Sequence, residues 1–216
     1  MIEQGTSEWF ELRRGKITGS VMDVVINGSN VAKNTLLEKL SFEYFNPDEP
    51  IKENEINSAP INHGKKFEPE AIAQYELEEN CDVERPAFIV HANIPYIGCS
   101  PDFTRLITPD DIVAVGEVKC PYKHEVHEAN VLYGAGKATY KAQIQTELEV
   151  IGADVCHFIS YCPTYPDHTN RYIKFDVFRD EKYIEDMLKK CEEFWDKLIN
   201  QERYENKFGG EIPSIF

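Results

Sequence analysis

The chain contains 216 residues, of which 42% are hydrophobic and 12% aromatic, and it carries a formal net charge of −15. These values exclude an intrinsically disordered protein and are typical of a globular one. No run of about eighteen apolar residues occurs, so we expect no membrane span. The first residues form neither a basic nor an apolar segment, so we expect no signal peptide. The length fits one domain, which we expect to cover residues 1–216.

The first part of the chain is predicted to be mainly helical. The predicted helices cover residues 7–14, 20–26, 33–45 and 60–80. Ser7 and Ser20 are candidate N-caps of the first two, because a serine oxygen accepts a hydrogen bond from a free backbone N–H. Pro69 is expected to kink or interrupt the last of these helices. Residues 46–58 are polar and acidic and are predicted to form a surface loop.

The second part of the chain alternates between strands and helices. The predicted strands cover residues 84–91, 95–99, 102–107, 112–119, 154–162 and 171–178. Residues 121–137 are predicted to form a long loop. Helices are predicted over residues 138–151 and 181–201, the second with Asp180 as its N-cap. The core order αβββαβ, preceded by N-terminal helices, predicts an α/β fold with a mixed sheet flanked by helices.

Six cysteines are scattered along the chain without a C-x-x-C pair, at positions 81, 99, 120, 156, 162 and 191. Without a secretion signal, reduced thiols in a cytosol-like compartment are the better interpretation. The spacing also gives no support for an iron–sulfur cluster. We therefore interpret all six as structural residues or as residues without a particular role.

Charged residues at the end of an apolar strand are the first sign of chemistry. Residues i and i+2 of a strand share a face, so Glu117 and Lys119 should project together, with Val118 pointing into the core. Asp102 lies fifteen residues before Glu117, far enough for an antiparallel return. Two carboxylates and the Val118 carbonyl suit Mg²⁺, and a lysine beside them can orient a water for metal-assisted hydrolysis. The alternative is an exposed Glu117–Lys119 ion pair without function.

Five segments in chain order carry a family resemblance. They are WFELRRGKITGS at residues 9–20, HGKKFEPEA at 63–71, GCSPD at 98–102, EVKCP at 117–121 and YKAQIQ at 140–145. Together they resemble the phage lambda exonuclease and YqaJ-like viral recombinase family, a branch of the PD-(D/E)-x-K nuclease superfamily. The resemblance implies a restriction-endonuclease-like core.

The resemblance also implies an activity. It implies a Mg²⁺-dependent 5′→3′ exonuclease, with Mn²⁺ able to substitute, that degrades 5′-phosphorylated double-stranded DNA to mononucleotides. The remaining 3′ single-stranded tails would serve recombination by strand annealing. It further implies a homotrimeric ring, a single-strand annealing partner protein, and a viral or prophage origin with action in the host cytoplasm. The alternatives are an endonuclease or resolvase of the same superfamily, or a DNA-end-binding interaction protein.

By the same resemblance, Glu68, Gln145 and Tyr140 join Asp102, Glu117 and Lys119 as catalytic residues. The neighbouring Glu70 makes a plain surface role for Glu68 a real alternative, and Gln143 is a less certain candidate than Gln145. Tyr140 also belongs to the apolar face of its helix, where it could serve only as a core residue.

The resemblance assigns Arg13, Ser20 and Ser100, together with Gln145, to binding of the 5′-phosphate and DNA. An arginine forks onto phosphate oxygens, and a helix N-terminus beside Ser20 favours an anion. Arg14 would replace Arg13 if the register differed by one residue.

The net charge of −15 argues against DNA binding, because DNA binding depends on neutralising phosphates. We expect an acidic outer surface with a basic cleft. Candidate backbone contacts are Lys65, Lys66, Lys137 and Lys141, which are equally well explained as solvated surface. His124 and His127 form an H-x-x-H pattern in the predicted loop, but oxygen-rich chemistry nearby makes us favour a structural role for them.

Overall fold

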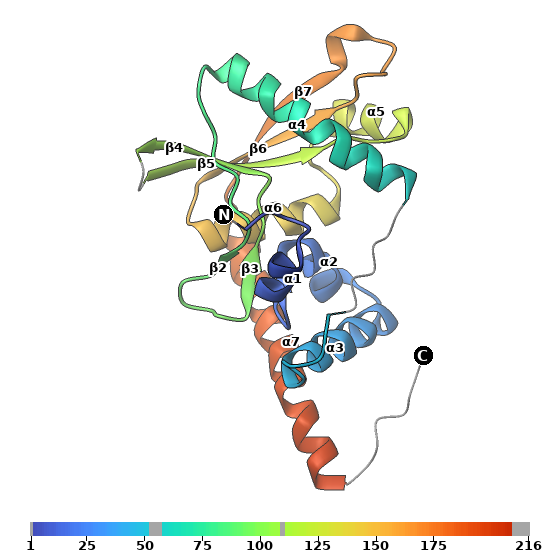
Figure 1. Ribbon diagram of the computed structural model, residues 1–216, viewed down its shortest axis with the longest axis vertical. Coiled ribbons are helices and arrows are strands. Elements are labelled where there is room, and N and C mark those ends of the chain that lie inside the picture. The colour runs from blue at the N-terminus through green and yellow to red at the C-terminus, as the bar shows by residue number, and fades with distance from the viewer. Residues whose placement is uncertain (1, 52–57, 109–110, 209–216) are drawn as a thin grey trace.

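The computed structural model describes residues 2–51, 58–108 and 111–208. The first half is helical, with a short strand after the first helix (Figure 1). Its elements are α1 (Ser7–Arg13), β1 (Ile17–Thr18), α2 (Gly19–Asn27), α3 (Asn30–Phe45) and α4 (Ala59–Glu79). Helix α4 continues through Pro69, so the predicted interruption there is wrong.

Seven strands form two sheets among the described residues. The smaller sheet has the order β1-β3-β2, with β2 (Ile89–Val90) antiparallel and β1 parallel to β3 (Ile97–Cys99). The larger sheet has the order β4-β5-β6-β7 and is mixed, because only the β5–β6 pair is parallel. Its strands are β4 (Phe103–Thr108), β5 (Asp111–Lys119), β6 (Val155–Tyr161) and β7 (Tyr172–Phe178). The predicted mixed sheet flanked by helices is confirmed, with the small sheet as an addition.

Three helices follow the β4–β5 hairpin: α5 (His124–Tyr133), α6 (Ala138–Ile151) and α7 (Glu181–Phe208), with a short 3₁₀ turn at His168–Asn170. The prediction of a loop over 121–137 is therefore wrong. The buried residues of α5 are His127 and Asn130, so the helix lacks the apolar stripe that sequence analysis looks for. Helix α6 has the predicted bounds, and α7 extends beyond its predicted end.

The helix caps agree with the sequence only in part. Asp180 caps α7 as predicted, accepting a hydrogen bond from the Tyr183 backbone N–H at 3.0 Å. Thr6, and not Ser7, caps α1 through its hydroxyl oxygen. Thr18, and not Ser20, is the N-cap residue of α2. Ser20 therefore lies within the first turn of α2.

Helices cover both faces of the larger sheet. On one face, Val118 and Ile159 pack with Ala71, Ile72 and Tyr75 of α4. On the other face, Val115 and Phe158 pack with Ile144 and Leu148 of α6. This arrangement directs alternate side chains of β5 into separate layers, one of which contains the polar residues of the site.

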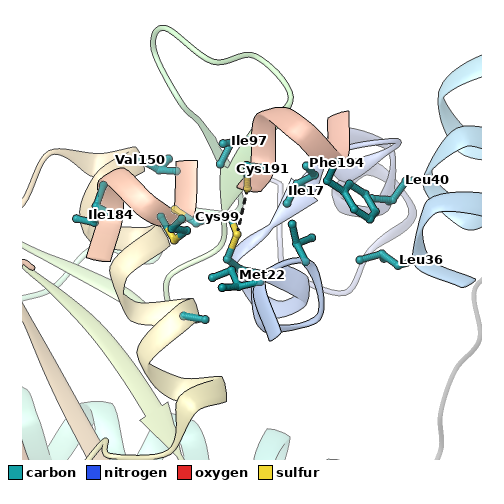
Figure 2. Close-up of a cluster of buried hydrophobic side chains, with 14 of the residues drawn as sticks. Ile17, Met22, Leu36, Leu40, Ile97, Cys99, Val150, Ile184, Cys191 and Phe194 are labelled. Atoms are coloured by element: carbon teal, nitrogen blue, oxygen red, sulfur yellow. Dashed lines mark hydrogen bonds between the residues drawn. The ribbon is translucent and has the colours of Figure 1, made fainter. Parts of the chain in front are cut away.

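A further core lies away from this sheet, where α2, α3 and α7 meet the small sheet (Figure 2). The Cys191 Sγ and Met22 Sδ atoms are 3.2 Å apart at its centre. Helix α7 extends from the larger sheet and packs beside α3 (Figure 1). All six cysteines are free thiols. None of the helices within the described residues is long and apolar enough to cross a membrane.

Gly116 allows β4 and β5 to pair closely. The strands are antiparallel with Phe103 opposite Gly116, and a Cβ added at Gly116 would lie 2.1 Å from the Phe103 ring. We predict that Gly116→Ala lowers the free energy of unfolding by about 1–3 kcal/mol, because the buried ring cannot move aside without strain. Urea unfolding measures the change. Gly64→Ala in α4 is the control, because its Cβ would meet no atom within 4 Å and should be neutral or stabilising. Equal destabilisation by both variants would contradict the packing argument.

Candidate active site

Strand β5 ends with the predicted alternation of charged and apolar side chains. The Lys119 ammonium donates a hydrogen bond to Glu117 Oε1, and Glu117 is only 1% exposed. Val118 points to the opposite face and packs under α4. Burial alone would lower the pKa of Lys119, but the nearby carboxylates of Glu117 and Asp102 outweigh it and raise that pKa. Lys119 is therefore a fixed positive charge.

The hairpin brings Asp102 to the same end of the sheet. Its backbone N–H donates to Gly116 O at 3.1 Å, and its Oδ2 accepts a hydrogen bond from the Val118 N–H at 2.6 Å. Burial raises the pKa of the Asp102 carboxyl well above its usual range, and the charge of Glu117 adds to this effect. Asp102 and Glu117 thus form a closely coupled pair, as the antiparallel return predicts.

Glu68 approaches this pair from α4. It forms an ion pair with Arg85, and burial raises its pKa, with a further contribution from the charge of Glu117. Glu70, the alternative, is exposed and accepts a hydrogen bond from the Tyr161 hydroxyl at 3.3 Å. Of the two glutamates, Glu68 is thus the one that interacts with the carboxylate pair.

A fourth carboxylate, Glu147 of α6, was not anticipated from the sequence. Glu147 is 1% exposed, and its Oε2 has no hydrogen-bond partner within the described part of the chain. Burial, followed by the charge of Glu117, raises its pKa well above the usual range. Its four-residue spacing from Gln143, which places both on one helix face, was the available sequence signal.

Gln143, and not Gln145, contacts the carboxylates. The Gln143 side-chain amide donates to Glu117 Oε2 at 2.7 Å and to Glu147 Oε1 at 3.0 Å. Gln145 instead donates to Phe178 O at 2.9 Å and accepts from the Asp180 N–H at 2.8 Å. Residues two apart on a helix point about 200° apart, so the two glutamines cannot serve one site.

This difference predicts opposite consequences for two similar variants. Gln143→Ala should lower kcat about tenfold or more while leaving stability almost unchanged, because its amide touches the carboxylates and is partly exposed. Gln145→Ala should instead lower the free energy of unfolding by about 1 kcal/mol or more, because the buried Gln145 side chain is lost and the Phe178 carbonyl and Asp180 N–H before α7 lose a partly buried partner. Turnover at saturating DNA and urea unfolding separate the two effects. If Gln145→Ala were fully folded and lost more kcat than Gln143→Ala, Gln145 would be the glutamine that acts in the site.

Tyr140 lies between the site and the core. Its ring centroid is 5.6 Å from the Lys119 ammonium and 5.2 Å from that of Lys137, and it packs 5.3 Å from the Phe158 ring. The negative face of an aromatic ring attracts such cations. Tyr140 therefore both packs on the sheet and helps to orient Lys119.

Arg13, Ser20 and Ser100, which are expected to bind a 5′-phosphate, lie together, with both serine hydroxyls in contact with the Arg13 guanidinium. Arg13 donates to Ser100 Oγ at 3.1 Å and to Ser20 Oγ at 3.1 Å, and its guanidinium lies 4.1 Å from the Trp9 ring centroid. Thr18 Oγ1 is also within 3.3 Å of Arg13. Trp9 and Thr18 were not anticipated as part of this cluster.

The charge of Arg13 is not neutralised by the described residues, none of which forms an ion pair with it. Burial lowers its pKa to about 10, which still leaves it charged at neutral pH. Arg14 instead pairs with Glu11 at 2.7 Å. A positive charge surrounded by hydroxyl groups, near the first turn of α2, is suited to an anion.

The remaining sequence candidates lie in different settings. Lys65 and Lys66 are exposed on α4, whereas Lys141 is paired with Asp180 at 2.8 Å. His127 is fully buried and bonds to Ser160 Oγ at 2.9 Å and Asn170 O at 2.7 Å. His124 bonds to Thr164 Oγ1 at 3.0 Å. The two histidines thus have separate partners, in keeping with the structural role favoured for them.

Burial of His127 predicts a dependence of stability on pH. Burial lowers its pKa below the ordinary value near 6.5, so the unfolded chain binds the proton first as the pH falls. The free energy of unfolding should therefore fall as the pH drops from about 6.5 toward the folded pKa, at up to about 1.4 kcal/mol per pH unit. Urea unfolding of wild type and His127→Gln at pH 7.5 and 5.5 isolates this contribution. Identical pH slopes for the two proteins would contradict it.

The donor set of the site fits a hard divalent cation. Among the described residues, no three His, Cys, Asp or Glu side chains are grouped closely enough to hold a metal on their own. Burial and the charge of Glu117 nevertheless raise the pKa of both Asp102 and Glu147, the charge of Lys119 acts in the opposite direction, and Glu147 Oε2 lacks a hydrogen-bond partner among the described residues. Asp102 and Glu117, with the Val118 carbonyl, are the residues that would hold such a cation.

Two carboxylates and a lysine at the end of a hairpin in a helix-covered mixed sheet are the features of a PD-(D/E)-x-K nuclease. Residues 8–154 match the YqaJ-like viral recombinase domain, and the chain belongs to this family. No curated protein sequence matches the chain.

Solved structures agree with this assignment. The chain is similar to the alkaline exonuclease LHK-Exo from Laribacter hongkongensis, with a TM-score of 0.81 and 26% identity over 94% of this chain and 97% of that one. LHK-Exo in complex with dAMP gives a TM-score of 0.81 and 27% identity over the same shares of both chains. A phage-related exonuclease from Haemophilus somnus 129PT shares the fold, with a TM-score of 0.63 and 13% identity over 87% and 96% of the chains. Family and fold together assign this chain to the enzymes of the alkaline exonuclease class.

Proposed function

We propose that the protein is a Mg²⁺-dependent 5′→3′ exonuclease that degrades 5′-phosphorylated double-stranded DNA to mononucleotides. The 3′ single-stranded tails that it leaves would serve recombination by strand annealing. The proposal treats residues 1–216 as one nuclease domain.

The observation that supports the proposal most strongly is that the residues around the Arg13 guanidinium lie next to the Asp102 and Glu117 carboxylates. Arg13 donates to Ser100, and Ser100 lies two residues before Asp102. A terminal phosphate held by Arg13 would therefore bring the first phosphodiester bonds of the chain toward Asp102 and Glu117. A nuclease that cuts inside a strand has no need for such a terminal anion site. The complex of the similar LHK-Exo with dAMP supports a mononucleotide as the product.

The chain's own residues have separate tasks in this proposal. Bound Mg²⁺ would supply Lewis-acid activation of water and charge neutralisation at the phosphate. Lys119 stabilises the negative charge that develops on the phosphate in the transition state. Gln143 holds the Glu117 carboxylate, and Tyr140 orients Lys119. Glu68 lies at the edge of the site, where it forms an ion pair with Arg85.

The charge of −15 requires an explanation for how the chain remains on DNA. We propose that a homotrimeric ring encloses the duplex, so that topology replaces part of the electrostatic affinity. The proposed partner is a single-strand annealing protein, and the proposed setting is the cytoplasm of a cell that carries the virus or prophage.

The proposed activity is tested by the ends of the DNA. Linear duplexes with 5′-phosphate or 5′-hydroxyl ends and a covalently closed circle are incubated with the protein and Mg²⁺, beside reactions with a chelator. Rapid, Mg²⁺-dependent loss of the 5′-phosphorylated linear DNA alone is the expected result. Cutting of the circle would replace the proposal with an endonuclease or resolvase. Binding of ends without any degradation would leave a DNA-end-binding protein.

A further inference from the structure

An exposed aromatic side chain follows the catalytic strand directly. Tyr122 is 53% exposed and lies three residues after Lys119. Three residues of extended chain span at most about 11 Å, so the Tyr122 backbone lies within a few nucleotides of the bond that Lys119 would act on.

His63 of α4 lies beside Tyr122, and Phe67 of the same helix lies beside His63. The His63 ring centroid is 5.5 Å from that of Tyr122 at an interplanar angle of 82°, and 4.6 Å from that of Phe67. The His63 Nε2 atom is buried without a hydrogen-bond partner among the described residues. Phe67 packs in turn on the core cluster that contains Val118 and Cys120. The three rings, called here the aromatic patch, are thereby anchored to the strand that carries the site.

Three lysines are neighbours in sequence of the residues that form the aromatic patch. Lys65 and Lys66 on α4 and Lys123 next to Tyr122 are exposed, and none of them forms an ion pair with another described residue. The Lys66 ammonium lies 4.8 Å from the Phe67 ring centroid. In a chain with a net charge of −15, three exposed lysines without a described ion pair next to these rings are a local exception. Interleaved rings and cations are the combination that binds single-stranded nucleic acid, because bases stack on the rings while phosphates meet the cations.

We propose that the aromatic patch, through Tyr122, stacks on a nucleobase of an unpaired DNA strand next to the scissile phosphodiester bond. This inference rests on the proposed exonuclease function and adds a subsite to it. Stacking holds the unpaired strand without regard to its sequence, since every base has a flat face. Tyr122 supplies the exposed ring, His63 and Phe67 fix its position, and the three lysines contact the phosphates.

The test combines a change in the protein with a change in the DNA. The full chain carrying Lys119→Ala, in the presence of a chelator so that the DNA stays intact, is titrated against a duplex with a single-stranded overhang. Abasic sites are introduced one at a time on either side of the first phosphodiester bond. Tyr122→Ala should weaken binding about tenfold, equivalent to about 1.4 kcal/mol, and Tyr122→Trp should restore it. Tyr133→Ala, which removes an even more exposed tyrosine at the end of α5, is the matched control and should bind as the parent does.

The decisive result is non-additivity. One abasic position should weaken binding by the Tyr122 protein about tenfold and leave binding by Tyr122→Ala unchanged, because ring and base form one contact. Additive losses of binding would overturn the stacking site, as would equal losses in Tyr122→Ala and Tyr133→Ala. It would also be overturned if Tyr122→Ala left DNA binding unaltered and the aromatic patch bound a protein partner instead. Cleavage of the same DNA by the wild-type protein, measured in parallel, separates the stacking site from the exonuclease function. If the wild type cleaves and Tyr122→Ala does not weaken binding, only the stacking site is refuted. If the protein neither cleaves nor binds the DNA, both the stacking site and the exonuclease function are refuted.

Discussion

Lys119→Ala is expected to lower kcat on linear DNA about 10²–10³-fold, with a much smaller change in KM. The physical reason is that the Lys119 ammonium is held beside Glu117 with its pKa raised, so its full charge faces the phosphate without reorganisation. Removing an interaction that is made mainly in the transition state lowers kcat.

Lys174→Ala is the matched control for this variant. Lys174 also pairs with a glutamate, Glu79, but the pair links β7 to α4 and does not involve Asp102 or Glu117. Its loss should change kcat less than about twofold, in the range of an ordinary surface pair. Thermal unfolding in Mg²⁺ verifies that both variants are folded. Equal losses of kcat in the two variants would mean that Lys119 acts only through stability.

Arg13→Lys is expected to abolish most of the preference for 5′-phosphorylated over 5′-hydroxyl ends. A guanidinium can donate to Ser100, Ser20 and a phosphate together, whereas an ammonium cannot reproduce its fork. Loss of a charged hydrogen bond is worth about 1.5–3 kcal/mol, so kcat/KM for phosphorylated ends should fall about 10- to 100-fold.

The ratio of rates on the two kinds of end is the measurement for Arg13, because it does not depend on how much of the variant is folded. Arg14→Lys provides the control, since Arg14 is already paired with Glu11 and bonds to the backbone of Asn46. It should keep the end preference of the wild type. A ratio that is unchanged in Arg13→Lys and lost in Arg14→Lys would assign the phosphate to the neighbouring arginine.

The larger sheet and its β4–β5 hairpin could be predicted because the apolar pattern of the sequence matches the burial of these strands in the fold. The apolar run before Gly116 marks β5, and the turn back from β4 gives the register that brings Asp102 to Val118. Helix α6 has strong periodicity, with Ile144 and Leu148 toward the sheet. Its bounds therefore follow from the sequence alone.

The choice between Gln143 and Gln145 could not be made from periodicity. The two side chains flank the same apolar stripe on opposite sides, and only the packing of α6 decides which flank meets the end of β5. Glu147 was missed for a related reason, because an acid beside an apolar stripe usually faces water. Helix α5 was missed because its buried side chains, His127 and Asn130, are polar and bond to Ser160.

The first product released from the DNA shows whether the terminal phosphate sets the position of cleavage. A duplex labelled at its 5′-phosphate is mixed with the protein and Mg²⁺, and the products of the first turnovers are separated by size. We expect the label to leave as a 5′-mononucleotide, because a terminal phosphate held by Arg13 would position the first phosphodiester bond at Asp102, Glu117 and Lys119. Label released first in longer oligonucleotides, or retained while the unlabelled 3′ ends shorten, would contradict it.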